Sequence, residues 1–279
     1  MTADTSQTDT YALGRTDDER ERLVAQATLF DRTTERYLRE GGLAAGMRVL
    51  DLGTGMGDVA VIAASIVGRE GRVVGVERDA DTVAAARARI DALGSANLEI
   101  VEGDVTALEG VGGQEPFDAA IGRLLLVHVA DPIAVLRGAA ARVRRGGVLV
   151  AMEYDAGWIP SHPPAPLWDG TVALLQEAFA RAGVHARMGL ELFGAFAAAG
   201  LPEPELRSEQ DVGGGAGWAG YTVLAETIRS LLPAIEATGL ATAAEVDPDT
   251  LADRLRADVV ATGGVAASPP LIGAWARVR

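Results

Sequence analysis

The sequence predicts an α/β fold built on a largely parallel sheet, and two observations support this prediction. From Met47 to Glu153, short runs rich in Val, Ile and Leu alternate with longer segments of helical periodicity. A glycine-rich turn, Gly53–Gly57, joins the first such run to the first helical segment. Strands and helices that alternate at this spacing form right-handed βαβ units with parallel strands.

The core elements follow in chain order. Strands are expected at residues 49–52, 72–77, 98–101, 117–121 and 148–153, the last after a turn at Gly146-Gly147. Helices are expected at residues 59–67 and 80–93, and another begins after Asp131-Pro132, a favourable pair for a helix start.

The chain is less regular after Glu153. Four prolines between Trp158 and Trp168 predict a loop that is no central strand. Beyond it we expect helices near 171–182 and 190–199, a strand at 205–212, a flexible stretch at 213–217, mostly helical structure over 218–264 and a final strand at 271–278.

A helical segment is expected before the first strand. Thr16 and Glu19 match a capping box, and helical periodicity continues until Gly41-Gly42 ends it. We therefore divide the chain into an N-terminal helical cap (1–42), a ligand-binding core (43–153), and lid insertions with the last strands of the core (154–279).

Composition excludes several kinds of chemistry. The 279 residues include no cysteine and no lysine, which excludes disulfides, thiolate sites, Schiff bases and phosphate-binding P-loops. A net charge of −14 argues against a nucleic-acid partner. With three histidines and no pair at metal-ligand spacing, we expect no metal site.

The sequence has no apolar run long enough to cross a bilayer, so no membrane association is expected. Residues 1–10 are polar and acidic, unlike a signal peptide, which predicts a cytoplasmic protein. A homodimer is left open.

The glycine turn and three carboxylates predict the ligand. Glycines between a strand and a helix allow a nucleotide-like ligand to approach the backbone. Asp51, Glu77 and Asp104 lie at or near the carboxyl ends of three successive strands and form an acidic crevice. Glu77 could accept hydrogen bonds from the ribose hydroxyls of either NAD or S-adenosylmethionine. The crevice suits the sulfonium and ammonium groups of S-adenosylmethionine better than a pyrophosphate, and Asp58 replaces the third glycine of the dinucleotide motif.

These residues resemble the class I S-adenosylmethionine-dependent methyltransferases over residues 47–153. The first motif of that family is similar to Val49–Gly57, its ribose-binding acid to Glu77, and its adenine-edge motif to Gly103-Asp104-Val105. The segment 124–132 resembles the menaquinone-biosynthesis-like subgroup, and the Tyr11-x-Leu-Gly opening resembles bacterial small-molecule methyltransferases.

The resemblance implies a Rossmann-like sheet of seven strands whose last strand, residues 271–278, is antiparallel, with helical cap insertions over S-adenosyl-L-methionine as the cofactor. The cofactor-binding residues that we expect are Tyr11, Asp51, Gly53, Thr54, Gly55, Gly57, Glu77, Arg78, Gly103, Asp104, Val105 and Arg123. Five of these have open alternatives: Glu77 and Asp104 could be solvated carboxylates at strand ends, Tyr11 could only pack, Asp51 could only orient the turn, and Arg123 could pair with a local acid.

Two residues at or just past the carboxyl ends of strands four and five are candidates for acid–base catalysis. His128 titrates near neutrality and could take a proton from an acceptor, or it could be a packing residue of the loop. Glu153 could act as a base or orient His128. The stretch from Trp158 to Trp168 could form an aromatic substrate wall or ordinary lid packing.

The function predicted is methyl transfer to an oxygen, nitrogen or carbon atom of a small molecule, such as a specialised metabolite or a quinone-like compound. The alternative is a protein of the same fold that binds the cofactor without transferring its methyl group, for a cyclisation, a rearrangement or regulation. An NAD-dependent short-chain dehydrogenase is disfavoured because its Tyr-x-x-x-Lys pair needs a lysine.

Overall fold

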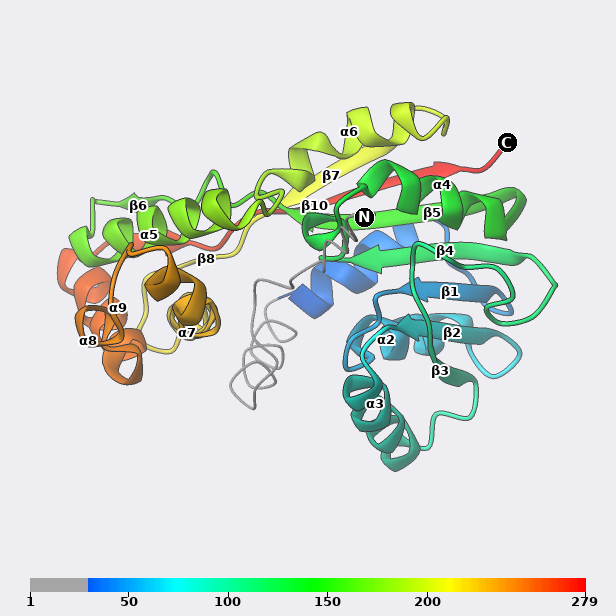
Figure 1. Ribbon diagram of the computed structural model, residues 1–279, viewed down its shortest axis with the longest axis horizontal. Coiled ribbons are helices and arrows are strands. Elements are labelled where there is room, and N and C mark those ends of the chain that lie inside the picture. The colour runs from blue at the N-terminus through cyan, green and yellow to red at the C-terminus, as the bar shows by residue number, and fades with distance from the viewer. Residues whose placement is uncertain (1–29) are drawn as a thin grey trace, which may run out of the picture.

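A seven-stranded sheet forms the centre of the computed structural model, which describes residues 30–279. The strand order is β3-β2-β1-β4-β5-β10-β7, and β10 runs antiparallel to both of its neighbours, β5 and β7 (Figure 1). The strands are β1 Arg48–Leu52, β2 Arg72–Glu77, β3 Leu98–Glu102, β4 Phe117–Arg123, β5 Val143–Tyr154, β7 Glu205–Glu209 and β10 Leu271–Arg277.

Helices cover both faces of this sheet. One face buries apolar side chains of the helical segment 30–40, α2 (Asp58–Val67) and α3 (Ala80–Leu93). The other face packs against α4 (Pro132–Arg142) and α6 (Met188–Ala198). A short 3₁₀ turn, η1 (Leu126–His128), lies between β4 and α4.

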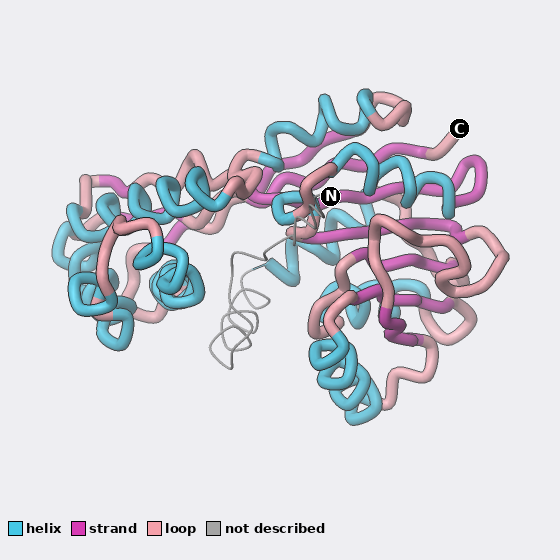
Figure 2. The backbone as a smooth tube through the Cα atoms, in the orientation of Figure 1, coloured by secondary structure: helices cyan, strands magenta, loops and turns pink. Residues whose placement is uncertain are grey.

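A second, mainly helical lobe lies beyond one end of the central strands (Figure 2). It contains α5 (Pro166–Ala182), α7 (Gly220–Ala237), α8 (Ala243–Val246) and α9 (Pro248–Thr262). A small antiparallel sheet joins β6 (Ser161–His162), β9 (Val265–Ala267) and β8 (Val212–Gly213). The apolar core of this lobe is continuous with the core on the α4–α6 face of the main sheet.

The Rossmann-like fold predicted from the sequence is confirmed, including seven strands and the antiparallel strand near the chain's end. Residues 72–77 and 80–93 have the predicted bounds, because strong local signals set them. Asp79 Oδ1 accepts a hydrogen bond from Thr82 N (2.9 Å) at the start of α3, and Gly94 ends it in a left-handed conformation. Asp131 Oδ1 likewise accepts from Ala134 N (2.8 Å) at the start of α4.

The start of β5 was predicted five residues too late, at Val148. Helix α4 runs directly into the strand at Val143, which pairs with Phe117. The turn expected at Gly146-Gly147 is instead an irregularity within the strand: Gly146 has φ 77°, and the register with β4 shifts between Phe117 and Ala119.

The lobe was only partly predicted. Helix α5 begins at Pro166, earlier than expected, because a proline fits the first turn of a helix. The region near Trp158 is no central strand, but it contributes β6 as an edge strand of the small sheet. That sheet was missed because its strands are two or three residues long and lie far apart in the sequence.

The expectations for Tyr11 and for the Thr16–Glu19 capping box fall outside the described residues. Among the helices within residues 30–279, none is long and apolar enough to cross a membrane.

Candidate functional site

The turn after β1 exposes bare backbone at the edge of the sheet. Gly53, Gly55 and Gly57 have φ values of 62°, 52° and 85°, which side chains rarely adopt. A Cβ at Gly53 would lie 2.7 Å from Leu125 Cδ1, whereas a Cβ at Gly55 would meet no atom within 4 Å. The turn therefore packs closely at its first glycine and is open at its second, as ligand binding through backbone groups requires.

Asp51 is buried under this turn. Its side chain is 1% exposed, and its Oδ2 accepts a hydrogen bond from Thr54 Oγ1 (2.6 Å). Burial raises the pKa of Asp51 to about 7, and the Thr54 hydroxyl opposes that shift. Asp51 hydrogen-bonds within the turn and also lines the cavity described below. Both alternatives for it, orienting the turn and contacting the ligand, therefore stay open.

Glu77 connects the end of β2 to the glycine turn. Its Oε2 accepts a hydrogen bond from Gly55 N (3.1 Å), and its Oε1 accepts from Arg78 N (2.9 Å) and Asp79 N (3.1 Å). The carboxylate is thus held at the mouth of the turn by backbone groups, a geometry that pre-organises it for further hydrogen bonds from a ligand.

Asp104 lies in the loop after β3. Its Oδ1 accepts hydrogen bonds from Thr106 N (2.8 Å) and Thr106 Oγ1 (2.7 Å). These two bonds lower the pKa of Asp104, so its carboxylate is ionised at neutral pH.

The structure brings most of the predicted residues around one cavity of about 520 Å³, a volume typical of small-molecule sites. The predicted residues that line it are Asp51, Gly53, Thr54, Gly55, Glu77, Arg78, Gly103, Asp104, Val105, Arg123 and His128. Gly57 and Glu153 do not line it, and Gly57 instead caps the start of α2.

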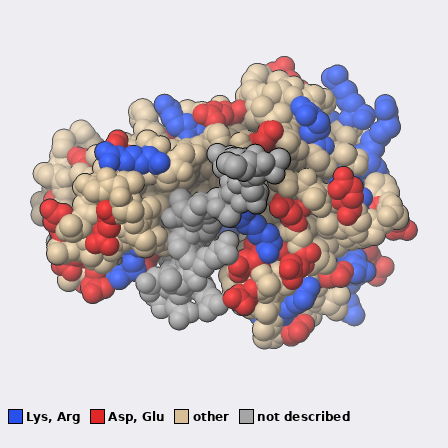
Figure 3. All heavy atoms as spheres, viewed as in Figure 1, with Lys and Arg blue, Asp and Glu red and all other residues tan. Residues whose placement is uncertain are grey.

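Charge is unevenly distributed within the cavity. Among the described residues of its lining, acidic side chains outnumber arginines, and these charged groups belong to loops and strand ends of the main sheet or to the first turns of α2 and α3. On the face of the molecule shown in Figure 3, acidic and arginine side chains are interspersed. The acidic lining residues are Asp51, Asp58, Glu77, Asp79, Asp81 and Asp104.

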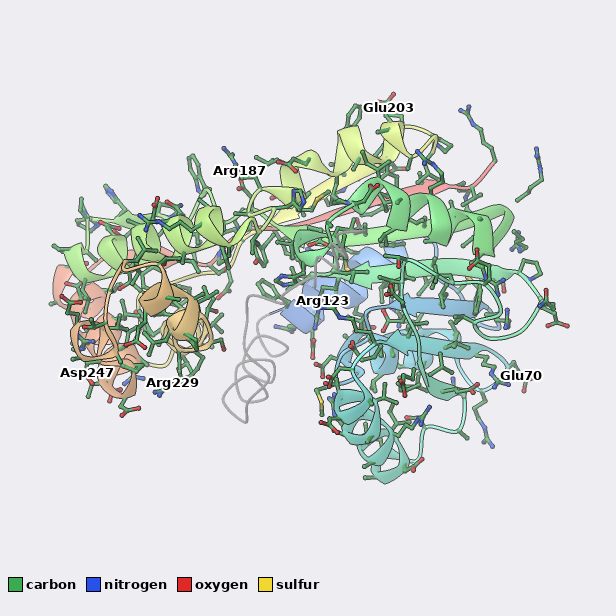
Figure 4. The ribbon with its side chains drawn as sticks, viewed as in Figure 1. Glu70, Arg123, Arg187, Glu203, Arg229 and Asp247 are labelled. Atoms are coloured by element: carbon green, nitrogen blue, oxygen red, sulfur yellow. The ribbon has the colours of Figure 1, made fainter. Side chains whose placement is uncertain are left out.

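Arg123 pairs with a local acid, one of the two alternatives left open for it, and it also lines the cavity. It lies beside the helical segment 30–40, where it is labelled in Figure 4. Its Nη1 is 3.2 Å from Asp31 Oδ1 and donates to Thr34 Oγ1 (2.8 Å), and its side chain is only 8% exposed. The guanidinium therefore fastens this helical segment to the end of β4.

Glu153 lies close to the cavity in the fold but does not line it. Its side chain is fully buried, and its Oε1 accepts hydrogen bonds from Leu126 N (2.7 Å) and Leu125 N (3.0 Å). Its Oε2 has no hydrogen-bond partner among the described residues. Burial raises the pKa of Glu153 to about 8, against the opposing effect of the backbone amides of η1. This position contradicts the expectation that Glu153 is a base in contact with substrate. Its carboxyl group instead accepts hydrogen bonds from the turn that carries His128.

Sequence reasoning missed most of the opposite wall of the cavity. Tyr154 and Phe179 line it with stacked rings whose centroids are 6.1 Å apart. Trp168 also lines it and is 1% exposed, whereas Trp158, at the other end of the aromatic stretch, is 63% exposed and lies outside it. Helical periodicity predicted a helix near α5 but could not show which of its faces would meet the glycine turn.

The described residues contain no group of three or more His, Asp or Glu side chains arranged to hold a metal ion.

Known proteins resemble the part of the chain that carries these features. A family model described as a methyltransferase domain matches residues 43–181. The chain belongs to the class I S-adenosylmethionine-dependent methyltransferases. S-adenosyl-L-methionine is the cofactor of this family, and the acidic crevice beside the open glycine turn fits its cationic groups.

Individual relatives support membership of the family. A protein from Sulfolobus acidocaldarius named as a probable cobalt-precorrin-6B C(15)-methyltransferase (decarboxylating) is 33% identical over 113 residues, which cover 40% of this chain and 56% of that protein. A ubiquinone biosynthesis O-methyltransferase from Nitrobacter winogradskyi is 29% identical over 127 residues, 46% of each chain. The chain thus spans about half the length of these curated relatives.

The fold also matches solved structures. A S-adenosylmethionine-dependent methyltransferase from Aquifex aeolicus aligns with a TM-score of 0.51 and 19% identity, over 71% of this chain and 92% of that one. This likeness concerns the fold of the family, and the menaquinone-biosynthesis-like subgroup stays a prediction.

Buried Glu153 makes the stability of this methyltransferase fold depend on pH. The unfolded chain ionises this carboxyl near 4.5, whereas the folded protein keeps it protonated up to about 8. The free energy of unfolding therefore falls as pH rises between these values, by roughly 1 kcal/mol per pH unit. Glu153→Gln, which stays neutral, should flatten the curve of unfolding free energy between pH 6 and 8, measured in urea.

Glu102→Gln is the matched control, because Glu102 ends β3 with an exposed side chain and should leave the slope as in the wild type. Asp51 contributes a slope of the same sign up to about pH 7 in all three proteins. An equally steep slope in Glu153→Gln would contradict the assignment of a buried, protonated Glu153.

Proposed function

We propose that the protein transfers the methyl group of S-adenosylmethionine to an oxygen, nitrogen or carbon atom of a small molecule, such as a specialised metabolite or a quinone-like compound. One observation carries the proposal. A single cavity extends from the glycine turn and its carboxylates to the aromatic wall of the lobe, so cofactor and acceptor would meet inside it.

The polar half of this cavity is the proposed cofactor site. Gly55 would present bare backbone, Glu77 would accept the ribose hydroxyls, and Asp104 would accept from the adenine amino group. Asp51 would hold the turn and add negative charge near the cationic end. Gly57 would support the site by starting α2, and Arg123 would support it by fixing the segment 30–40. The residues proposed for cofactor binding are Tyr11, Asp51, Gly53, Thr54, Gly55, Glu77, Arg78, Gly103, Asp104 and Val105.

The proposed reaction is a single displacement. Bound S-adenosylmethionine supplies a methyl carbon made electrophilic by the positive sulfur. An electron pair of the acceptor, on oxygen or nitrogen or from an activated carbon, would form the new bond to this carbon as the carbon–sulfur bond breaks. The electron pair of the broken bond would stay on sulfur. The protein positions the acceptor, excludes water and provides a destination for the proton that the acceptor loses.

His128 is the proposed proton acceptor. It ends η1 and lines the cavity, while the adjacent residues of η1 and of the turn before it are held by the Glu153 carboxyl group. Imidazole titrates near neutrality, so it can take a proton from a phenol or an activated carbon acid without a large shift. Glu153 acts in this proposal as a positioning residue of the turn.

Glu77→Ala should weaken binding of S-adenosylhomocysteine at least tenfold, measured by titration calorimetry, because charge-assisted hydrogen bonds are lost. Glu102→Ala is a matched control: it removes a carboxylate that pairs in register with Glu77 on the neighbouring strand but does not line the cavity. Unchanged affinity in Glu77→Ala, or preferential binding of NAD by the wild type, would refute the proposed cofactor site.

Methyl transfer itself is tested with methyl-labelled S-adenosylmethionine and a panel of small phenols, hydroquinones and aromatic amines. We expect label in at least one product, with release of S-adenosylhomocysteine detected by mass spectrometry. Cofactor binding without any labelled product across the panel would contradict transfer and favour a role in which the methyl group stays in place.

With an acceptor from that panel, His128→Gln should lower turnover by about a hundredfold or more, while cofactor affinity changes by no more than a few-fold. His162→Gln is the control, since His162 lies in β6 and does not line the cavity. Near-normal turnover in His128→Gln would mean that positioning alone accelerates the reaction.

A further inference from the structure

We propose that the acceptor is an uncharged, largely apolar, ring-sized molecule with one polar group at its reacting end. The inference rests on the proposed function and concerns the half of the same cavity that lies against the lobe. Three properties of that half support it: its apolar surface, its lack of charged side chains among the described residues, and the hydrogen bonds that its Thr and Ser hydroxyl groups already donate within the protein.

The lobe half of the cavity is lined by aromatic and aliphatic side chains. Tyr154 and Phe179 stack with an interplanar angle of 16°, and Leu175 and Leu224 add aliphatic surface from α5 and α7. Such a surface gains free energy by covering apolar rings and returns little of the hydration that a bare charge loses.

Trp168 forms a fixed part of this wall. Its ring centroid lies 5.5 Å from that of Trp218 and 6.1 Å from that of Tyr221, the latter in an edge-to-face arrangement. Its indole N–H points to Ile159 O (3.4 Å). Trp168 is therefore backed by two aromatic rings and presents ring carbon, with its donor already used, to the cavity.

Tyr154, Thr227 and Ser268 carry the hydroxyl groups among the described residues of this half, and the last two already donate their protons to backbone carbonyl groups. Thr227 Oγ1 donates to Val223 O (2.7 Å), and Ser268 Oγ donates to Pro269 O (3.2 Å). An acceptor with several polar groups would leave some of them without partners, at a cost of about 1–3 kcal/mol each.

A charged acceptor would have no counterion among the described residues of the lobe half of the cavity. Among the described residues that line the cavity, those from residue 154 onward include no Asp, Glu or Arg. Arg123, on β4, is already engaged with Asp31 and Thr34, and the chain has no lysine. A carboxylate or phosphate on the buried part of the acceptor would therefore be desolvated without compensation. An ammonium would gain about 2 kcal/mol from the aromatic ring faces, less than the several kcal/mol of hydration that it loses.

The test uses three probes of similar shape: 2-naphthol, 2-naphthoate and the ammonium form of 2-naphthylmethylamine. Each is titrated at pH 7 into protein saturated with S-adenosylhomocysteine, and heat is measured by calorimetry. We expect 2-naphthol to bind at least tenfold more tightly than either charged probe. Equal or tighter binding of a charged probe, or no binding of 2-naphthol, would overturn the inference.

A charge placed on the wall should change this preference. Thr227→Arg puts a guanidinium on the partly exposed, cavity-lining position of α7 and should raise the affinity for 2-naphthoate at least tenfold. Thr222→Arg makes the same substitution on the same helix outside the cavity lining and should leave probe binding unchanged. Unaltered 2-naphthoate affinity in Thr227→Arg would count against the proposed location of the acceptor.

The binding of S-adenosylhomocysteine distinguishes a failure of the proposed function from a failure of the inference about the acceptor. If the wild type fails to bind it, the proposed function fails. If it binds with the expected dependence on Glu77 and the probes show no preference for the neutral compound, only the inference about the acceptor fails.

Discussion

The hydrogen bonds between the buried carboxyl of Glu153 and the backbone of Leu125 and Leu126 are the interaction on which the site depends. Strand β5 lies next to β4 in the sheet, and these bonds connect the end of β5 to the turn that follows β4. One residue further, Tyr154 enters the wall of the cavity, so a single dipeptide fixes both the turn that carries His128 and the first aromatic ring of the acceptor half. Burying an ionised carboxyl group costs free energy, and the raised pKa of Glu153 reflects that cost.

The cavity combines two chemically different surfaces because two parts of the fold build it. Parallel strands end at one edge of the sheet, so the turns after β1, β2 and β3 bring glycine backbone and carboxylates together there. The lobe, whose apolar core continues from one face of the sheet, adds a wall of aromatic and aliphatic side chains. Figure 4 shows Arg187 where the lobe joins the sheet, and its Nε lies 3.1 Å from Oδ1 of nearly buried Asp155.

The polar half of the site could be predicted from the sequence, and the apolar half could not. Gly53, Gly55 and Glu77 lie at fixed spacings from strands with clear periodicity, so local patterns placed them at one edge of the sheet. The partners of Glu153 and the wall around Trp168 depend on contacts between segments far apart in the chain, which periodicity does not encode. The small sheet of β6, β9 and β8 was missed for the same reason.

The central claim is that cofactor and acceptor share one cavity, divided between the glycine turn and the aromatic wall. A crystal structure of the protein with S-adenosylhomocysteine tests it most directly. The account predicts the ribose hydroxyls within hydrogen-bonding distance of Glu77, the amino-acid part of the ligand beside Gly53 and Gly55, and the sulfur facing the space bounded by His128 and Tyr154. Ligand bound outside this cavity, or with its sulfur turned away from the aromatic wall towards solvent, would contradict the account.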